Sequence, residues 1–437
     1  MASRKKPPQH SGTKLEAQVD LVVRAFQEAE PPTEIGVAFV DEESRVVDYL
    51  FQEGVILIRD ADIERVRAAL DGGRPRNALI NGLTLFSLEG SQYEEVLAAL
   101  DHLDIALGVG VATPNHVLSI TQRQPTGVTI CPATEPEETL TTAPDPGVCP
   151  GQRDGSGVFV SVVDTGLLAG APAAHRWLAG VTGEEDPFAG GVIPPYTGHG
   201  TFVAGVLRCM APASEVVLER VLVRAGAVLE SDIIQQLDDA LDRVPDVISL
   251  SAGGRSRNKL PLLGFEVFWQ ERLRHYKGVV LVAAAGNDGD RGPFWPAAFP
   301  WTVSVGALAA NWRTRASFSD YGGWVDVYAP GEGLINAYAT GTFVCQEPPH
   351  VNESREFHGM ARWSGTSFST PLVAGLIAAR MSRTGENGRQ AADALLATAR
   401  AQALAGVGAV LLPCLDDGDG HGRPAGCCEH RHHCGRC

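Results

Sequence analysis

The stretch VFVSVV, residues 158–163, decides the fold class of this chain. It is apolar except for one serine and rich in β-branched valine, which is typical of a parallel strand buried on both faces. Three later stretches repeat this type, namely VVLERVLV (216–223), DVISLS (246–251) and GVVLVAAA (278–285). Between residues 233 and 241 apolar residues recur at helical spacing. Strands that alternate with helices predict an α/β domain with a doubly wound, mainly parallel sheet.

Before this domain the sequence predicts a smaller unit. Residues 1–33 are expected to form a tail, disordered up to residue 13, and one short amphipathic helix. Residues 34–121 contain two strand–helix passes, which favour a small ferredoxin-like α+β domain. Residues 122–154 are rich in proline and glycine and are interpreted as a linker. The α/β domain is then expected at residues 155–400, followed by a Cys/His-rich tail at 401–437.

Composition limits the partners of the chain. With 44% hydrophobic and 20% charged residues it has the composition of an ordinary soluble globular protein. A formal net charge of -16 argues against nucleic acid or an anionic membrane as the main partner. No apolar run reaches the roughly 18 to 20 residues of a membrane span. No signal peptide is recognisable, because Pro7 and Pro8 follow the basic residues 4–6. We therefore expect a cytoplasmic protein, with export by another route left open.

Four polar side chains stand where the expected strands end or helices begin: Asp164, His199, Asn287 and Ser367. Each alone has an ordinary structural explanation, since Asp and Ser often cap helices and Asn-Asp-Gly favours a turn. A lone histidine is likewise more often a packed residue. In parallel sheets, however, function collects at the carboxyl ends of the strands. The joint order of the four residues therefore predicts a catalytic triad with an oxyanion donor.

Two other hydrolase classes fit these residues less well. The triplet DTG (164–166) also occurs in aspartic proteases, but that chemistry needs a second carboxylate, and no second DTG or DSG is present. An α/β-hydrolase needs G-x-S-x-G, whereas position 369 is a serine, and its nucleophile comes first along the chain. Pro371 fits the first turn of a helix that begins near Ser367. The amides of that turn would favour negative charge beside the serine.

Taken together, four blocks of the sequence resemble the signature blocks of the subtilisin-like (subtilase, S8-type) serine proteases. They are VVDTG (162–166), GHGTFVAG (198–205), AAAGN (283–287) and GTSFSTPLVAG (365–375). The resemblance covers roughly residues 155–383 and implies a subtilisin-like serine endopeptidase. It also implies the roles of four residues, which are Asp164 as orienting acid, His199 as general base, Ser367 as nucleophile and Asn287 as oxyanion donor. The alternative is a non-catalytic or highly selective peptide-binding module of the same fold.

The resemblance further implies a cleft for an extended peptide or protein substrate. The family pairs the stretch that matches SLSAGG (249–254) with substrate backbone, as an added strand. The implied pocket walls have small side chains, which suggests a roomy pocket; they include Ser251, Ala252, Gly253, Gly254, Ala284, Ala285 and Gly286. No cofactor is expected for catalysis, and a need for calcium is left open.

The N-terminal unit resembles the family's inhibitory propeptide. By that resemblance its last strand, NHVLSIT (115–121), would lie in the cleft of its own chain and act as an intramolecular inhibitor. Processing would then occur near Thr121 or within the linker. A permanent docking domain is the alternative.

Two segments depart from the family pattern. The stretch CQEPPHVNESREFHGMARW (345–363) lengthens the connection to Ser367 and is expected either to narrow the cleft or to form a surface hairpin. The tail carries cysteines with zinc-ligand spacing, namely Cys427, Cys428, Cys434 and Cys437. The alternatives here are a structural zinc clip and a disordered tail that binds metals adventitiously. An odd total of nine cysteines argues against a disulfide framework.

Overall fold

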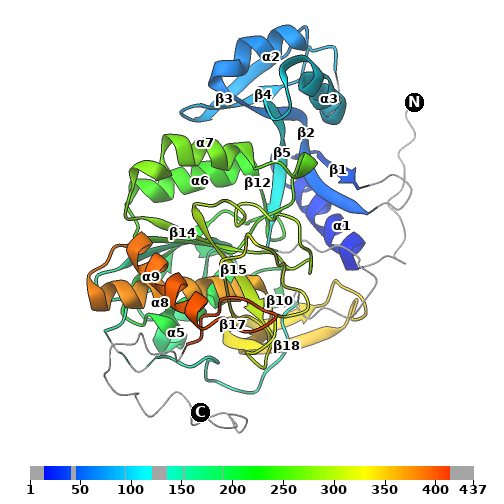
Figure 1. Ribbon diagram of the computed structural model, residues 1–437. Helices are drawn as coiled ribbons and strands as arrows, with labels where there is room; N and C mark the ends of the chain where they lie inside the picture. Colours follow the sequence, from blue (N-terminus) through cyan, green and yellow to red (C-terminus); the bar gives the residue numbers. More distant parts are fainter. Residues whose placement is uncertain are drawn as a thin grey trace.

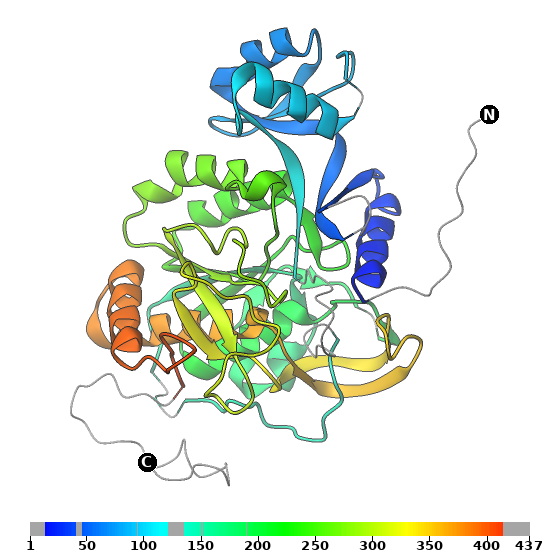
Figure 2. The same cartoon turned by 45° about the vertical axis from the view of Figure 1, so that its right-hand side comes forward.

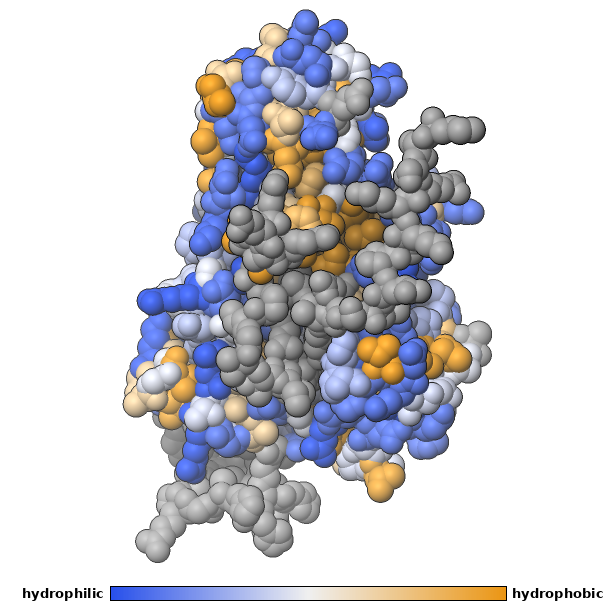
Figure 3. Space-filling view, turned by 90° about the vertical axis from the view of Figure 1, so that its right-hand side faces the viewer, coloured by the Kyte–Doolittle hydropathy of each residue, from blue (hydrophilic) through white to orange (hydrophobic). Residues whose placement is uncertain are grey.

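The computed structural model describes residues 14–40, 46–93, 95–120, 135–149, 151, 153–188 and 190–413. A small N-terminal domain stands on a larger α/β domain (Figures 1 and 2). On the face shown in Figure 3, hydrophilic side chains predominate and apolar ones gather mainly in the upper half of the molecule. Among the described residues no helix is long and apolar enough to cross a membrane.

The larger domain is built on a seven-stranded sheet of order β16-β15-β14-β13-β6-β11-β8. Its strands are β6 (Phe159–Asp164), β8 (Thr182–Gly183), β11 (Glu215–Arg220), β13 (Val247–Leu250), β14 (Val280–Ala284), β15 (Thr302–Leu308) and β16 (Val327–Pro330). Every neighbouring pair is parallel. Parallel neighbours need crossover connections, which are supplied here by helices and loops on the two faces of the sheet. The structure confirms the predicted α/β fold.

Helices cover both faces of this sheet, and the alternation of side chains along β6 shows why. Val162 packs in a cluster with residues of α5 and α8, whereas Val163 packs in a second cluster with residues of α6 and α7. The helices are α5 (His199–Met210), α6 (Glu230–Asp242), α7 (Leu263–Glu271), α8 (Thr366–Thr384) and α9 (Gly388–Ala401), with a short α4 (Ala171–Ala174). A strand buried on both faces therefore explains the nearly continuous apolar run from which the fold was predicted.

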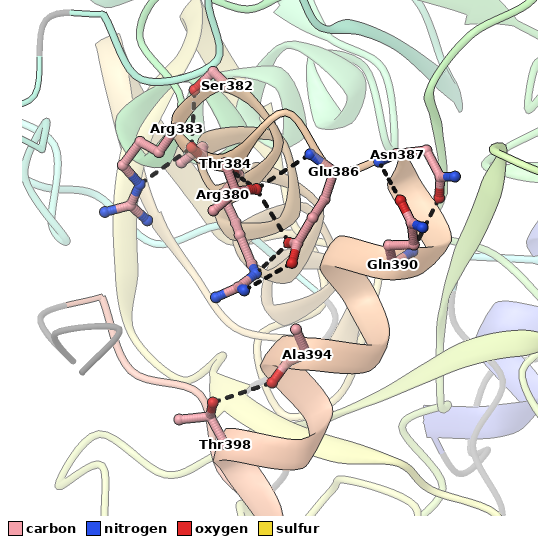
Figure 4. Close-up of polar contacts among 10 residues, drawn as sticks. Arg380, Ser382, Arg383, Thr384, Glu386, Asn387, Gln390, Ala394 and Thr398 are labelled. Atoms are coloured by element: carbon pink, nitrogen blue, oxygen red, sulfur yellow. Dashed lines mark hydrogen bonds and ion pairs between the residues drawn. The ribbon is translucent and has the colours of Figure 1, made fainter. Parts of the chain in front are cut away.

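The junction between α8 and α9 is held by polar contacts (Figure 4). Arg380 binds Glu386 through Nε (2.6 Å) and Nη2 (3.0 Å). Asn387 starts α9 with a capping box, because its Oδ1 accepts from Gln390 N (3.0 Å) and Gln390 Oε1 accepts from Asn387 N (3.2 Å). These contacts fix the end of α8, the helix that carries Ser367 at its other end.

The packed chain extends beyond the expected end of the domain at residue 400. After α9, Val410 bridges to Tyr328 of β16 and packs against it together with Leu404 and Val407. The part of the expected tail that the structure describes, residues 401–413, therefore belongs to the packed domain. The reason is that these apolar side chains cover the ring of Tyr328.

The N-terminal domain is a layer of helices on an antiparallel sheet. Its elements are α1 (Lys14–Gln27), β1 (Ile35–Phe39), β2 (Val47–Arg59), α2 (Ile63–Ala69), β3 (Arg74–Ile80), β4 (Leu83–Ser87), α3 (Val96–Leu107) and β5 (Ala112–Ser119). The strand order β5-β2-β4-β3, with the passes β2-α2-β3 and β4-α3-β5, is that of a ferredoxin-like domain. The sequence did not indicate β3, because five of its seven residues are exposed and show no apolar alternation.

A long hairpin follows β16. Strands β17 (Leu334–Val344) and β18 (Ser354–Trp363) pair with each other, and β17 also pairs with β10 (Val192–Ile193). Within the expected linker, Glu137 and Asp145 lie on this hairpin through backbone bridges to Arg362 and Ile335. This part of the chain is thus bound to the hairpin rather than extended between domains.

The two domains share one sheet and one apolar cluster. Strand β5 pairs antiparallel with β12 (Ala227–Leu229) of the larger domain. Leu118 of β5 packs in the same cluster as Ile233 of α6 and Leu263 of α7. Shared backbone pairing and shared burial hold the domains together more firmly than isolated surface ion pairs would.

Candidate active site

Asp164 and His199 form a buried pair at the carboxyl edge of the sheet. Asp164 is the last residue of β6, and His199 is the first residue of α5. Nδ1 of His199 lies 2.7 Å from Asp164 Oδ1, and both side chains are almost fully buried. An ionised Asp164 can only accept, so Nδ1 donates and Nε2 is the basic nitrogen. His199 Nε2 is buried and has no hydrogen-bond partner among the described residues, so it is available to take a proton.

A second buried carboxylate holds the backbone around this pair. Asp186, at the end of β9 (Glu185–Asp186), accepts from Gly198 N (2.7 Å) and from Thr165 Oγ1 (3.1 Å). Burial raises the pKa of Asp186. Gly198 has φ 83°, a left-handed conformation that glycine adopts without strain. Sequence reasoning missed Asp186, because an acidic residue in a short polar stretch carries no signal of burial.

Ser367 stands in the first turn of α8. Ser367 Oγ donates to Ser251 O at 3.4 Å, and Ser251 Oγ donates to Ser367 O at 2.8 Å. The ring of Phe368, the next residue, lies 5.3 Å from the imidazole of His199. Trp363 meets the same imidazole edge-on, also at 5.3 Å. The two aromatic rings hold the histidine on the side of the serine.

Asn287 follows β14 and is oriented by the same helix start. Its Oδ1 accepts from Thr366 N (2.9 Å) and from Thr366 Oγ1 (3.0 Å). Since the amide oxygen is occupied in this way, Nδ2 is the end of the side chain that can donate to a substrate. A donor fixed beside Ser367 is the geometry that an oxyanion site requires.

The residues expected to line a cleft lie at the ends of β13 and β14 and are all buried: Ser251, Ala252, Gly253, Gly254, Ala284, Ala285 and Gly286. The last strand of the N-terminal domain runs antiparallel beside them. Ser119 and Gly253 exchange both backbone hydrogen bonds, at 2.9 and 3.1 Å, and Ile120 N donates to Gly226 O at 3.0 Å. Sequence reasoning missed the second side of this cleft, Gly226 with β12, because a three-residue strand has no recognisable pattern.

Two further predictions fall outside the described residues. The first is the processing expected near Thr121. The second is the metal site expected at the four tail cysteines, Cys427, Cys428, Cys434 and Cys437. Within the described ranges, no group of three or more His, Cys, Asp or Glu side chains could hold a metal ion.

A buried Asp–His pair beside a serine and an oriented amide is the constellation of a serine hydrolase. Residues 155–419, more than half of the chain, match the subtilase family, Peptidase S8. The chain therefore belongs to the subtilase family, and its class is that of the subtilisin-like serine endopeptidases.

Curated relatives and solved structures agree with this assignment. Thermitase from Thermoactinomyces vulgaris is 31% identical over 256 residues, which cover 55% of this chain and 81% of thermitase. A thermophilic serine proteinase from Bacillus sp. (strain AK1) is 31% identical over 259 residues, or 56% of this chain and 57% of the relative. The structure of fervidolysin from Fervidobacterium pennivorans, a keratinolytic enzyme related to subtilisin, matches 83% of this chain and 60% of its own, with a TM-score of 0.54. At 18% identity that match shows the fold alone.

Proposed function

We propose that this chain cleaves peptide bonds through Asp164, His199 and Ser367. The observation that carries the proposal is the buried imidazole whose Nδ1 is fixed by Asp164 while Nε2 has no partner among the described residues. His199 Nε2 takes the proton of Ser367 as its Oγ attacks the substrate carbonyl. The protonated imidazole then gives this proton to the leaving amine as the peptide C–N bond breaks, and water hydrolyses the resulting acyl-enzyme. A fluorophosphonate probe, which reacts with an activated serine, tests this proposal against a non-catalytic peptide-binding module: it should label the processed protein and not a Ser367→Ala variant.

Asn287 is proposed as the donor to the oxyanion of the tetrahedral intermediate. Replacement by alanine is expected to lower kcat by about 10²–10³-fold with little change in KM, because the donor acts on charge that develops only in the transition state. Asn287→Asp is the sharper variant. It keeps the oxygen that accepts from Thr366 N but removes the amide N–H groups. Steady-state kinetics on a chromogenic peptide measure both variants, and an unchanged kcat in Asn287→Asp would remove this role.

We further propose that the N-terminal domain is an inhibitor of its own active site. Its backbone uses the same edge, Gly253, that an extended substrate would use, and it pairs with β12 on the other side. The interface is also specific. His116 Nδ1 lies 3.0 Å from Glu230 Oε2 in a fully buried contact, and Arg257 Nη1 binds Asp104 at 2.6 Å. A peptide substrate cannot enter while β5 occupies this position.

Ser119→Pro tests the inhibition. Proline removes the N–H that donates to Gly253 O, so the last strand should bind less well and hydrolysis should appear sooner after the protein is made. Ser119→Ala is the matched control, because it removes the hydroxyl but keeps the backbone donor, and it should resemble the wild type. The time course of peptide hydrolysis by freshly purified full-length protein is the measurement. Equal lag times in all three proteins would favour a permanent docking domain.

A further inference from the structure

The ring of Phe294 lies between the two strand ends that flank Ser367. A Cβ placed on Gly253 would stand 2.4 Å from Phe294 Cε1, and a Cβ placed on Gly286 would stand 2.9 Å from Phe294 Cδ2. The same ring therefore touches the wall that follows β13 and the wall that follows β14. Phe294 is only 3% exposed. The ring takes up space that a side chain would need at both wall positions. At Gly286 the carboxylate of Asp320 is nearer still, at 2.4 Å, and the φ of 103° also favours glycine.

The backbone that carries Phe294 is fixed to one of these walls. Trp295 N donates to Gly254 O at 2.9 Å, and Gly254 N donates to Trp295 O at 2.8 Å. Ala298 N donates to Phe294 O at 2.9 Å, and the ring of Trp295 packs on Phe299 at 4.6 Å. The ring cannot leave the space between the walls unless this pairing is broken.

The register of β5 shows which substrate residue would meet this ring. Ser119 lies opposite Gly253, and the two strands are antiparallel. In a peptide bound in that register, one residue takes the place of Ser119 opposite Gly253. The residue two positions later, toward the C-terminus of the peptide, then lies opposite Ser251. Ser251 O lies 3.4 Å from Ser367 Oγ. The substrate residue opposite Ser251 is therefore the one whose carbonyl Ser367 attacks. Its side chain would enter the space between the walls, where Phe294 lies.

We propose that Phe294 fills most of this specificity pocket and restricts cleavage to bonds that follow a small residue, namely glycine, alanine, serine or threonine. The inference rests on the endopeptidase function proposed above and names its substrate class. It also replaces the roomy pocket expected from the small wall residues. At Gly253 and Gly286 the absence of a side chain makes room for an aromatic ring of the chain itself, not for the substrate.

The charges near the pocket do not favour a basic substrate side chain instead. Two carboxylates follow Asn287, but Arg255 already binds both of them, through Nε to Asp288 (3.1 Å) and through Nη2 to Asp290 (2.7 Å). A lysine or arginine of the substrate would have to compete with this internal guanidinium. A third carboxylate, Asp320, lies beside Gly286, but burial holds its pKa well above the ordinary value and so disfavours its charged form. Charge attraction therefore does not offset the missing volume.

Cleavage profiling with a peptide library tests the proposal. The processed wild type should cut after glycine, alanine, serine or threonine, whereas Phe294→Ala should accept leucine and phenylalanine. The ratio of kcat/KM for a phenylalanine substrate over its alanine analogue should rise by about 10–200-fold, the range by which apolar pockets discriminate. Phe294→Leu should give a smaller rise and serves if the alanine variant fails to fold. Phe268→Ala is the control, because it truncates a fully buried ring on α7 and should leave the ratio unchanged.

The outcomes separate this inference from the proposed function. A wild type that cuts readily after phenylalanine, leucine, lysine or arginine would overturn the small pocket and leave the endopeptidase intact. The small pocket would likewise be overturned if the kcat/KM ratio of the phenylalanine substrate to its alanine analogue did not change in either Phe294 variant. The inference would also be contradicted if the fluorophosphonate labelled the processed wild type but only the Phe294 variants cut after small residues. Absence of both labelling and cleavage would instead contradict the proposed function, on which the inference depends.

Discussion

Replacement of Ser367 by alanine is expected to lower peptide hydrolysis by about 10⁶-fold, because the triad loses the only group that forms the acyl-enzyme. The same substitution should stop processing, so the variant should remain a full-length chain under conditions in which the wild type is cut. A chromogenic peptide assay of the purified proteins and a denaturing gel measure the two effects. The fold should survive, since among the described residues Ser367 Oγ makes a single long hydrogen bond, to Ser251 O.

Ser369→Ala is the matched control for this result. Ser369 lies in the same turn and is also buried, but its hydroxyl donates to Ala329 O (3.0 Å) and to Pro330 O (3.2 Å). Its loss should cost about 1 kcal/mol of stability and leave turnover near the wild-type level. If both serine variants were truncated at the same position as the wild type, the cut would come from another protease. Autoprocessing would then be excluded.

Asp164→Asn is expected to lower kcat by about 10⁴-fold. Asp164 accepts from His199 Nδ1 and so keeps the basic nitrogen of the imidazole on the side of Ser367. An asparagine amide can donate to Nδ1 instead, which moves the ring proton to Nε2 and removes the base. Measurement of kcat and KM at neutral pH should show nearly the whole effect in kcat.

Asp246→Asn is the control for the aspartate variant. Asp246 Oδ2 accepts from Phe159 N at 2.9 Å and therefore contacts the opposite end of β6, away from the site. This variant should lose some stability and keep its kcat. Equal losses of kcat in the two variants would show that β6 had been displaced in both, and the orienting role of Asp164 would have no support.

The elements that sequence reasoning predicted are those whose burial leaves a pattern in the residues. The buried strand at 158–163 corresponds to β6, and the apolar run at 278–285 contains β14. Exposed elements leave a weaker pattern. Strand β3 is nearly all exposed and was missed. Strand β18 mixes buried and exposed residues without regular alternation, and a hairpin was only one of two alternatives for the stretch 345–363 that contains it. Helix α9 was missed for another reason: Gly385 ends α8, and the capping box at Asn387 starts a new helix only two residues later.

The candidate site divides in the same way. Asp164, His199, Asn287 and Ser367 could be found because each stands next to a strong strand or helix signal. Asp186 and Phe294 could not, because their positions depend on approaches between segments distant in sequence, to Gly198 in one case and to Gly253 in the other. The sequence correctly indicated small residues in the pocket walls. It could not indicate how much of the pocket is open, because that depends on the Phe294 ring beside the walls.

The pairing of β5 with β12 has a consequence for the order of events during activation. Among the described residues, the contacts that hold the N-terminal domain on the peptidase domain involve positions before residue 121, so a cut after that residue leaves these contacts intact. Chain scission and dissociation are then two steps with separate rate constants. The onset of activity would follow the residence time of the severed domain on its partner, not the moment at which the bond is cut.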